Sequence, residues 1–103
     1  MDNVVIAIPA FEPDRRLPEL VRQLKSDFRD IVIVNDGSRH ADAVFAELKN
    51  VDGVLVLSHG ENRGKGAALK TGFRHLIEAA GGSGTLPDVI TADADGQHTP
   101  QDI

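Results

Sequence analysis

The stretch that decides the fold is VVIAIPAF at residues 4–11, in which residues 4–8 are all apolar and a proline follows them. Three further short apolar runs, rich in β-branched residues, occupy residues 31–34, 54–57 and 89–91. The runs are nearly continuous and do not alternate between apolar and polar positions, which is typical of strands covered on both faces. We therefore expect four strands in a parallel sheet that lies between layers of helices.

Between these runs, apolar residues recur every three or four positions, as they do on one face of a helix. The three patterns occupy residues 17–28, 41–48 and 68–80, and Gly81-Gly82 ends the third. Strands that alternate with helices form βαβ units with right-handed crossovers. The sequence therefore predicts an α/β fold, with a parallel Rossmann-like sheet of about four strands and flanking helices.

The length of 103 residues suits a single domain, which we place at residues 1–103. Thr99-Pro100 has the form of a helix start so near the end that we expect a truncated domain.

The formal net charge is −5 and all four aromatic residues are Phe, which argues against a nucleic-acid surface. No apolar run approaches the roughly 20 residues that cross a bilayer, and the start resembles no leader, so we expect no transmembrane segment and a cytoplasmic location.

Cysteine is absent, which excludes disulfides and thiolate metal ligands. Any metal would therefore be held by oxygen or imidazole, a preference that favours hard cations. The histidines have no zinc-binding spacing, and we interpret each as a surface or supporting group. They are His40, His59, His75 and His98.

Polar and glycine-rich sequence follows all four apolar runs. The four segments are PAFEP at 9–13, NDGS at 35–38, HGENRGKG at 59–66 and DADGQH at 93–98. In an open parallel sheet, ligands bind beyond the carboxyl ends of the strands, where helix amino ends also gather. We therefore expect these segments to converge on one site.

Asp93 and Asp95 give the clearest chemical signal, because two carboxylates one residue apart repel each other unless a cation neutralises them. Mg²⁺ or Mn²⁺ bound there would also hold a diphosphate by its oxygens. Gln97 adds an amide oxygen two residues further on. The alternative is a solvated acidic turn, and the other three polar segments favour the metal site over it.

The two middle segments predict contacts with a nucleotide. Asp36 can accept hydrogen bonds from a base or ribose while Gly37 allows close backbone approach, although a plain turn or helix cap fits as well. Residues 62–66, NRGKG, open the third helix, where free amides favour an anion and Arg63 and Lys65 add positive charge. Their spacing matches neither the P-loop nor the dinucleotide fingerprint.

Taken together and in order, four motifs resemble the amino-terminal, nucleotide-binding half of a family 2 glycosyltransferase with the GT-A fold. The motifs are VVIAIPAF, IVIVNDGS, ENRGKGAAL and DVITADADGQH, and the resemblance that they mark extends over nearly the whole chain. DADGQH together with GKGAAL is most similar to members that move a hexose onto a polyprenyl phosphate.

The resemblance implies a set of site residues. Those it assigns to the nucleotide are Pro9, Ala10, Glu12, Asp36, Gly64, Lys65 and Asp93. Those it assigns to a Mg²⁺ or Mn²⁺ ion that bridges the diphosphate are Asp95, Asp93 and Gln97. The sequence departs from the family pattern in two places: Glu12-Pro13 stands where Asn-Glu is usual, and Asn35 replaces the first Asp before Gly-Ser.

The implied reaction transfers a hexose from a UDP- or GDP-sugar to an acceptor, a lipid phosphate in the most similar members, with inversion and metal assistance. Complete members continue into an acceptor-binding half that holds the catalytic base. We therefore expect this chain alone to bind the donor nucleotide with little or no transferase activity, and the full-length protein to work at the inner face of the membrane.

Two other functions stay open at the level of sequence. A strand that ends in Asp-x-Asp-Gly also opens the haloacid-dehalogenase-like phosphotransferases, where the first Asp is the nucleophile, but Gln97 stands where those enzymes place Thr or Val. The other is a non-catalytic α/β regulatory module with an acidic pocket, which would show no nucleotide selectivity.

Overall fold

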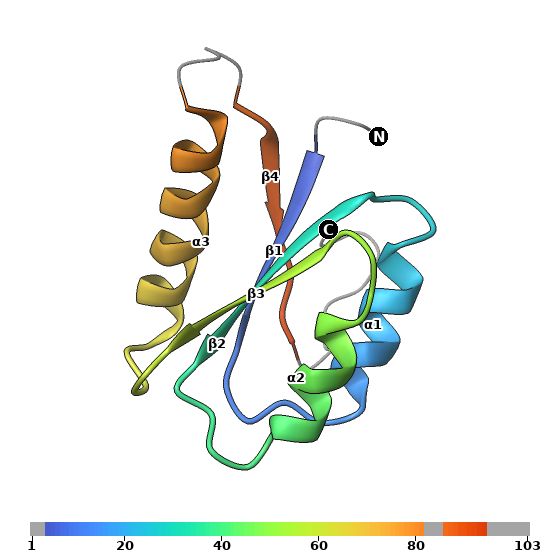
Figure 1. Ribbon diagram of the computed structural model, residues 1–103, viewed down its shortest axis with the longest axis vertical. Helices are drawn as coiled ribbons and strands as arrows, with labels where there is room; N and C mark the ends of the chain where they lie inside the picture. Colours follow the sequence, from blue (N-terminus) through green and yellow to red (C-terminus); the bar gives the residue numbers. More distant parts are fainter. Residues whose placement is uncertain (1–3, 82–85, 95–103) are drawn as a thin grey trace.

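The computed structural model describes residues 4–81 and 86–94 (Figure 1). The described strands form one parallel four-stranded sheet with the order β3-β2-β1-β4. The predicted α/β architecture is therefore confirmed. In chain order, the elements are β1 (Val4–Ala10), α1 (Arg16–Leu24), β2 (Asp30–Asp36), α2 (Asp42–Lys49), β3 (Val54–His59), α3 (Lys65–Ala80) and β4 (Asp88–Thr91).

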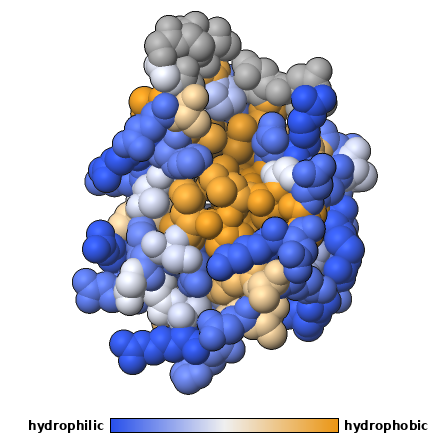
Figure 2. Space-filling view, viewed as in Figure 1, coloured by the Kyte–Doolittle hydropathy of each residue, from blue (hydrophilic) through white to orange (hydrophobic). Residues whose placement is uncertain are grey.

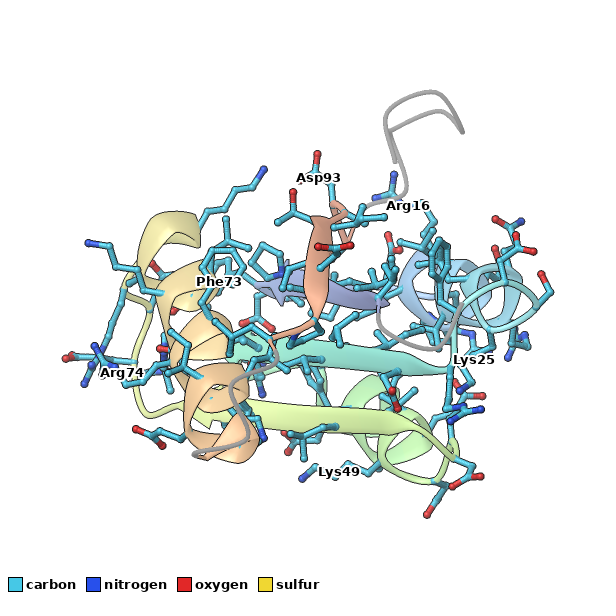
Figure 3. All side chains as sticks on the ribbon, turned by 90° about the horizontal axis from the view of Figure 1, so that it is seen from above. Arg16, Lys25, Lys49, Phe73, Arg74 and Asp93 are labelled. Carbon is cyan, nitrogen blue, oxygen red and sulfur yellow. The ribbon has the colours of Figure 1, made fainter. Side chains whose placement is uncertain are left out.

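Helices cover both faces of the sheet, with α1 and α2 on one face and α3 on the other (Figures 1 and 3). Successive side chains of the central strands point to opposite faces of the sheet, so alternate residues pack against the two helix layers. Ile6 and Ile33 pack in the cluster that includes α1 and α2, whereas Val32 and Val34 pack with Ala68 of α3. All five side chains are buried, so the two inner strands carry the core.

The connections place a topological switch beside β1. Helices α1 and α2 carry the chain stepwise from β1 to β2 and then β3, whereas α3 crosses the opposite face to reach β4 on the far side of β1. Neighbouring strands β1 and β4 therefore have connections on opposite faces. In open α/β sheets, the crevice at the carboxyl ends of such a strand pair is the place where ligands bind.

The expectation that all four strands are covered on both faces is wrong for the two outer strands. In β3, Leu55 is 39% exposed, and β4 begins and ends with the exposed residues Asp88 and Thr91. The reason is geometric, because α3 packs over the two inner strands and leaves the outer ones partly open on its side. Figure 2 shows the resulting apolar area over the β3 edge of the sheet.

The helix ends follow the sequence in one case and depart from it in another. Gly81 caps α3 with a positive φ of 59°, as the Gly-Gly pair predicts. Helix α1 ends at Leu24, earlier than its apolar pattern, although the amide of Phe28 still donates to the carbonyl of Leu24 at 2.8 Å. The Phe28 side chain packs against the core from beyond the helix.

None of the described helices is long and apolar enough to cross a bilayer.

Candidate functional site

The carboxyl ends of β1, β2 and β4 meet the start of α3 at one pocket. The residues that line it are Pro9, Ala10, Phe11, Asp36, Asn62, Gly64, Lys65 and Asp93. They come from all four segments that the sequence predicts to converge. Of the predicted site residues, Glu12 does not line this pocket, and Asp95 and Gln97 lie outside the described residues.

Asp36 is the buried charge of the site, with only 3% of its surface exposed. Its Oδ1 accepts hydrogen bonds from the backbone amide of Arg63 at 2.9 Å and from the ring Nδ1 of His59 at 2.8 Å. Its Oδ2 accepts one from the amide of Gly64 at 2.8 Å. The carboxylate thus ties the end of β2 to the loop that opens α3, a role that the sequence did not indicate.

Burial of Asp36 opposes its ionisation and by itself raises its pKa. The hydrogen bonds from His59 and from the amides of Arg63 and Gly64 outweigh burial, so the pKa of Asp36 lies below its usual value. The group is therefore charged at neutral pH. A buried carboxylate with three donors is strongly tied to its surroundings, because each such bond involves a full charge.

Because the pKa of Asp36 is lower in the folded protein than in the unfolded chain, its contribution to stability is present above the usual value of 3.8 and is lost as pH falls below it. We expect Asp36→Asn to lower the free energy of unfolding at pH 7 by about 3 kcal/mol. In urea titrations, the difference between the free energies of unfolding of the two proteins should be constant near neutral pH and narrow as pH falls below 3.8. Other carboxylates are common to both proteins and cancel, so a difference that stays constant there too would show that Asp36 is not the titrating group.

His59 and Thr71 extend the network around Asp36. The ring Nε2 of His59 lies 2.7 Å from the hydroxyl oxygen of Thr71 on α3, and the His59 side chain is only 7% exposed. From the sequence, His59 is predicted to be a surface or supporting group, and no role is predicted for Thr71. A usable signal exists, since aligning the second and third apolar runs sets Asp36 opposite His59, as they pair in the sheet.

Gly37 permits the close approach of two loops. Its φ is +76°, and a β-carbon built on it would lie 2.3 Å from both the amide nitrogen of Asn62 and the carbonyl carbon of Glu61. The close approach expected from the sequence is therefore found, but its partner here is the chain itself. Beside it, Asn35 Oδ1 accepts a hydrogen bond from the amide of Ser38 at 3.0 Å, which shapes the turn.

Glu12 faces away from the pocket lining, toward the segment that precedes α2. Its carboxylate accepts hydrogen bonds from the amides of Arg39 and His40, both at 3.0 Å. These two bonds lower the pKa of Glu12. Its backbone takes a positive φ of 46° and donates to the Ser38 hydroxyl at 2.8 Å. The predicted place of Glu12 in the pocket is thus not met, and the residue instead joins the loops that follow β1 and β2.

Lys65 and Asp93 face each other across the pocket. Nζ of Lys65 lies 2.6 Å from Oδ1 of Asp93, and the two side chains are 63% and 47% exposed. Exposed ion pairs contribute little to stability, so this pair is free to rearrange around a ligand. Figure 3 shows Asp93 beyond the end of β4.

The donor chemistry at this end of the pocket fits a hard cation in part. Asp93 supplies a carboxylate at the pocket wall, which is the ligand type that Mg²⁺ and Mn²⁺ prefer. Within residues 4–81 and 86–94, no three His, Asp or Glu side chains are grouped as a metal centre. The remaining predicted ligands, Asp95 and Gln97, lie outside that part of the chain.

Comparison with known proteins agrees with this arrangement. The family model described as glycosyl transferase family 2 matches residues 5–103. An uncharacterized protein of Methanocaldococcus jannaschii is 35% identical over 103 residues, which cover 99% of this chain and 39% of that protein.

Two relatives have named activities. A UDP-N-acetylglucosamine–dolichyl-phosphate N-acetylglucosaminyltransferase of Methanococcus voltae is 29% identical over 117 residues, covering 97% of this chain and 44% of that protein. An undecaprenyl-phosphate 4-deoxy-4-formamido-L-arabinose transferase of Pseudomonas fluorescens is 38% identical over 111 residues, which cover 97% of this chain and 30% of that protein. The predicted likeness to transferases that act on polyprenyl phosphates is thus confirmed. The chain spans less than half the length of each of these relatives.

Proposed function

The chain belongs to glycosyl transferase family 2, and from that premise we propose that the whole protein transfers a hexose from a nucleoside-diphosphate donor to a polyprenyl phosphate. The observation that carries the proposal is the pocket at the carboxyl edge of the sheet that brings Asp36, Lys65 and Asp93 together. The names of the relatives support a lipid phosphate as acceptor. The whole protein would then work at the inner face of a membrane.

Asp36 supports a preference for particular bases. Its Oδ1 already accepts two hydrogen bonds and its Oδ2 accepts one, so Oδ2 keeps one acceptor position. A carboxylate only accepts, so this position suits a base whose ring nitrogen on the pairing edge carries a hydrogen. The ring nitrogen N3 of uracil and N1 of guanine do so, whereas N3 of cytosine and N1 of adenine are acceptors that would face the carboxylate oxygen. We therefore propose UDP- or GDP-sugars as donors.

The start of α3 supports binding of the diphosphate. The amides of Arg63 and Gly64 are used by Asp36, so they hold the loop and are not available to phosphate. In a helix that begins at Lys65, the next amides have no acceptor within the helix and favour an anion. The Lys65 ammonium adds a full positive charge to the wall of the same pocket.

In the proposed reaction, the acceptor oxygen displaces the nucleoside diphosphate from the anomeric carbon with inversion, and negative charge grows on the leaving phosphate. Lys65 would stabilise that charge. Mg²⁺ or Mn²⁺, when bound by Asp93 together with Asp95 and Gln97, would supply further neutralisation of the diphosphate. Pro9, Ala10 and Phe11 would form the apolar wall of the base and ribose pocket.

Calorimetric titration of the intact protein tests the proposal. We expect UDP or GDP to bind at least about tenfold more tightly than ADP and CDP, because a base acceptor facing a carboxylate leaves a buried polar pair unmatched. We expect Mn²⁺ to strengthen binding, and Lys65→Ala to weaken it. Lys49→Ala, on an exposed site of α2, serves as the control. Equal binding of all four nucleotides with and without Mn²⁺ would favour the non-catalytic module, and a phosphoryl group trapped on Asp93 would favour a phosphotransferase.

A further inference from the structure

A hydrogen-bonded chain of three side chains crosses the inside of the site. It runs from Oδ1 of Asp36 to Nδ1 of His59 at 2.8 Å, and from Nε2 of His59 to Oγ1 of Thr71 at 2.7 Å. The three residues belong to β2, β3 and α3. The Asp36 and His59 side chains are only 4% and 7% exposed. The chain ends at Thr71, a partly buried residue on the second turn of α3.

From this arrangement, we propose that His59 is a positioning residue for donor binding, which fixes the carboxylate of Asp36 from behind so that its other side can hold the α3 loop and face the nucleotide. The proposal rests on the proposed function, because it assigns Asp36 to the donor pocket. His59 does not line that pocket, so it would act only through Asp36.

The direction of the hydrogen bonds follows from the chemistry of the groups. A charged carboxylate only accepts, so the proton of the His59–Asp36 bond lies on Nδ1 of His59. The Thr71 hydroxyl donates to Nε2 of a neutral ring, and its oxygen accepts from Nε2 of a protonated ring. Both ring nitrogens have a partner in either form, which fixes the plane of the ring.

The bond from His59 leaves Asp36 little freedom to rotate. Oδ1 is held by the ring and by the amide of Arg63, so Oδ2 is directed to the amide of Gly64 and to the pocket. Without His59, the buried carboxylate loses one charge-assisted bond and can turn about its side-chain axis. The loop amides and the acceptor position for the base would then change together.

Thr71 provides the second anchor of α3. The helix is held at its start, where the amides of Arg63 and Gly64 donate to Asp36, and again at Thr71 through His59. Both anchors lead to the same carboxylate. The orientation of Lys65, which follows Gly64 directly, therefore depends on the same network.

Three substitutions separate these roles in the intact protein. His59→Phe removes both ring hydrogen bonds and keeps a ring in place, whereas His59→Asn keeps an N–H donor close to the position of Nδ1. Thr71→Val removes only the hydroxyl at nearly constant shape. His75→Phe is the matched control, because it makes the same change of side chain at a residue of α3 that does not line the donor pocket.

Two measurements are made on each variant: amide hydrogen exchange at Arg63 and Gly64 without nucleotide, and KM and kcat for the sugar donor. We expect His59→Phe to raise the exchange rate of these two amides about tenfold and to raise KM for the donor about tenfold, because one bond to a charged group is lost. The change in kcat should be smaller. For His59→Asn, the exchange rates and KM should stay within about threefold of those of the natural protein. For Thr71→Val, both quantities should lie between those of His59→Asn and His59→Phe. His75→Phe should change neither quantity, and exchange in β1 and β2 should be unaltered throughout.

The proposal is overturned if His59→Phe leaves exchange at Arg63 and Gly64 unchanged, or if His59→Asn restores neither quantity although the sheet stays protected. Should His59→Phe not fold, Thr71→Val decides by the same criteria, because it leaves the ring in place. The exchange measurement needs no substrate. A natural protein that binds no nucleotide sugar would therefore defeat the proposed function while the exchange results still report on His59.

Discussion

Gly37→Ala is expected to lower the free energy of unfolding by about 3 kcal/mol or more, measured by urea titration of the intact protein. The new methyl group would lie 2.3 Å from backbone atoms of Asn62 and Glu61, and backbone cannot yield as a flexible side chain can. The φ of +76° adds strain for any residue with a β-carbon. Since the loop of residues 61–64 is held to Asp36, the substitution should also displace the donor pocket.

Gly66→Ala is the matched control for this prediction. Gly66 lies in the first turn of α3, and apart from its chain neighbours and the backbone of its own helix, no atom is within 4 Å of the position its β-carbon would take. Alanine favours a helix over glycine, so we expect the control to be neutral or to gain up to about 1 kcal/mol. A Gly37→Ala protein as stable as the Gly66→Ala protein would show that the two loops do not meet as described.

Asp93→Asn is expected to lower kcat/KM for glycosyl transfer by about 100-fold or more, because a cation on a diphosphate supplies several kcal/mol of charge stabilisation that a neutral amide holds poorly. The carboxylate also orients Lys65, whose Nζ lies 2.6 Å away. We expect the loss to be only partly reversed by raising the Mn²⁺ concentration, with stability almost unchanged since both side chains are about half exposed.

Asp88→Asn gives a control at the other end of β4. Asp88 is the exposed first residue of β4 and lies at the opposite end from Asp93. Its substitution removes the same charge from the protein, so we expect transfer to remain within about twofold of the natural rate. If the two substitutions reduce transfer equally, the effect belongs to the net charge and Asp93 has no local role.

The fold, and the convergence of the four polar segments on one site, can be predicted from the sequence and the geometry of parallel strands. Four apolar runs without alternation indicate a parallel sheet, and parallel strands bring their carboxyl ends to one edge. Asp36 and Asp93, which lie far apart in the chain, could therefore be assigned to one pocket from the amino-acid sequence alone. Gly37 could also be assigned to a close approach, because a glycine has no side chain to keep another segment away.

Partners between distant side chains could not be predicted in this way. Glu12 reaches Arg39 and His40 because its backbone takes a left-handed conformation, which nothing in its residue type demands. His59 meets Asp36 because of the register between β2 and β3; aligning the second and third apolar runs points to this pair, but the runs alone do not establish that the two strands are neighbours. Exposure of the outer strands depends on which strands α3 covers, and the apolar runs do not specify that packing.

The central claim is that segments far apart in the chain form one metal-assisted nucleotide site at the carboxyl edge of the sheet. It is tested most directly by nuclear magnetic resonance of the intact protein with UDP or GDP, comparing Mn²⁺, which broadens nearby amide signals, with Mg²⁺, which does not. We predict that Mn²⁺ broadens the signals of Ala10, Gly64, Lys65 and Asp93 together and leaves Asp88 sharp. Broadening that spares Gly64 and Lys65, or that centres on the amino ends of the strands, would contradict the account.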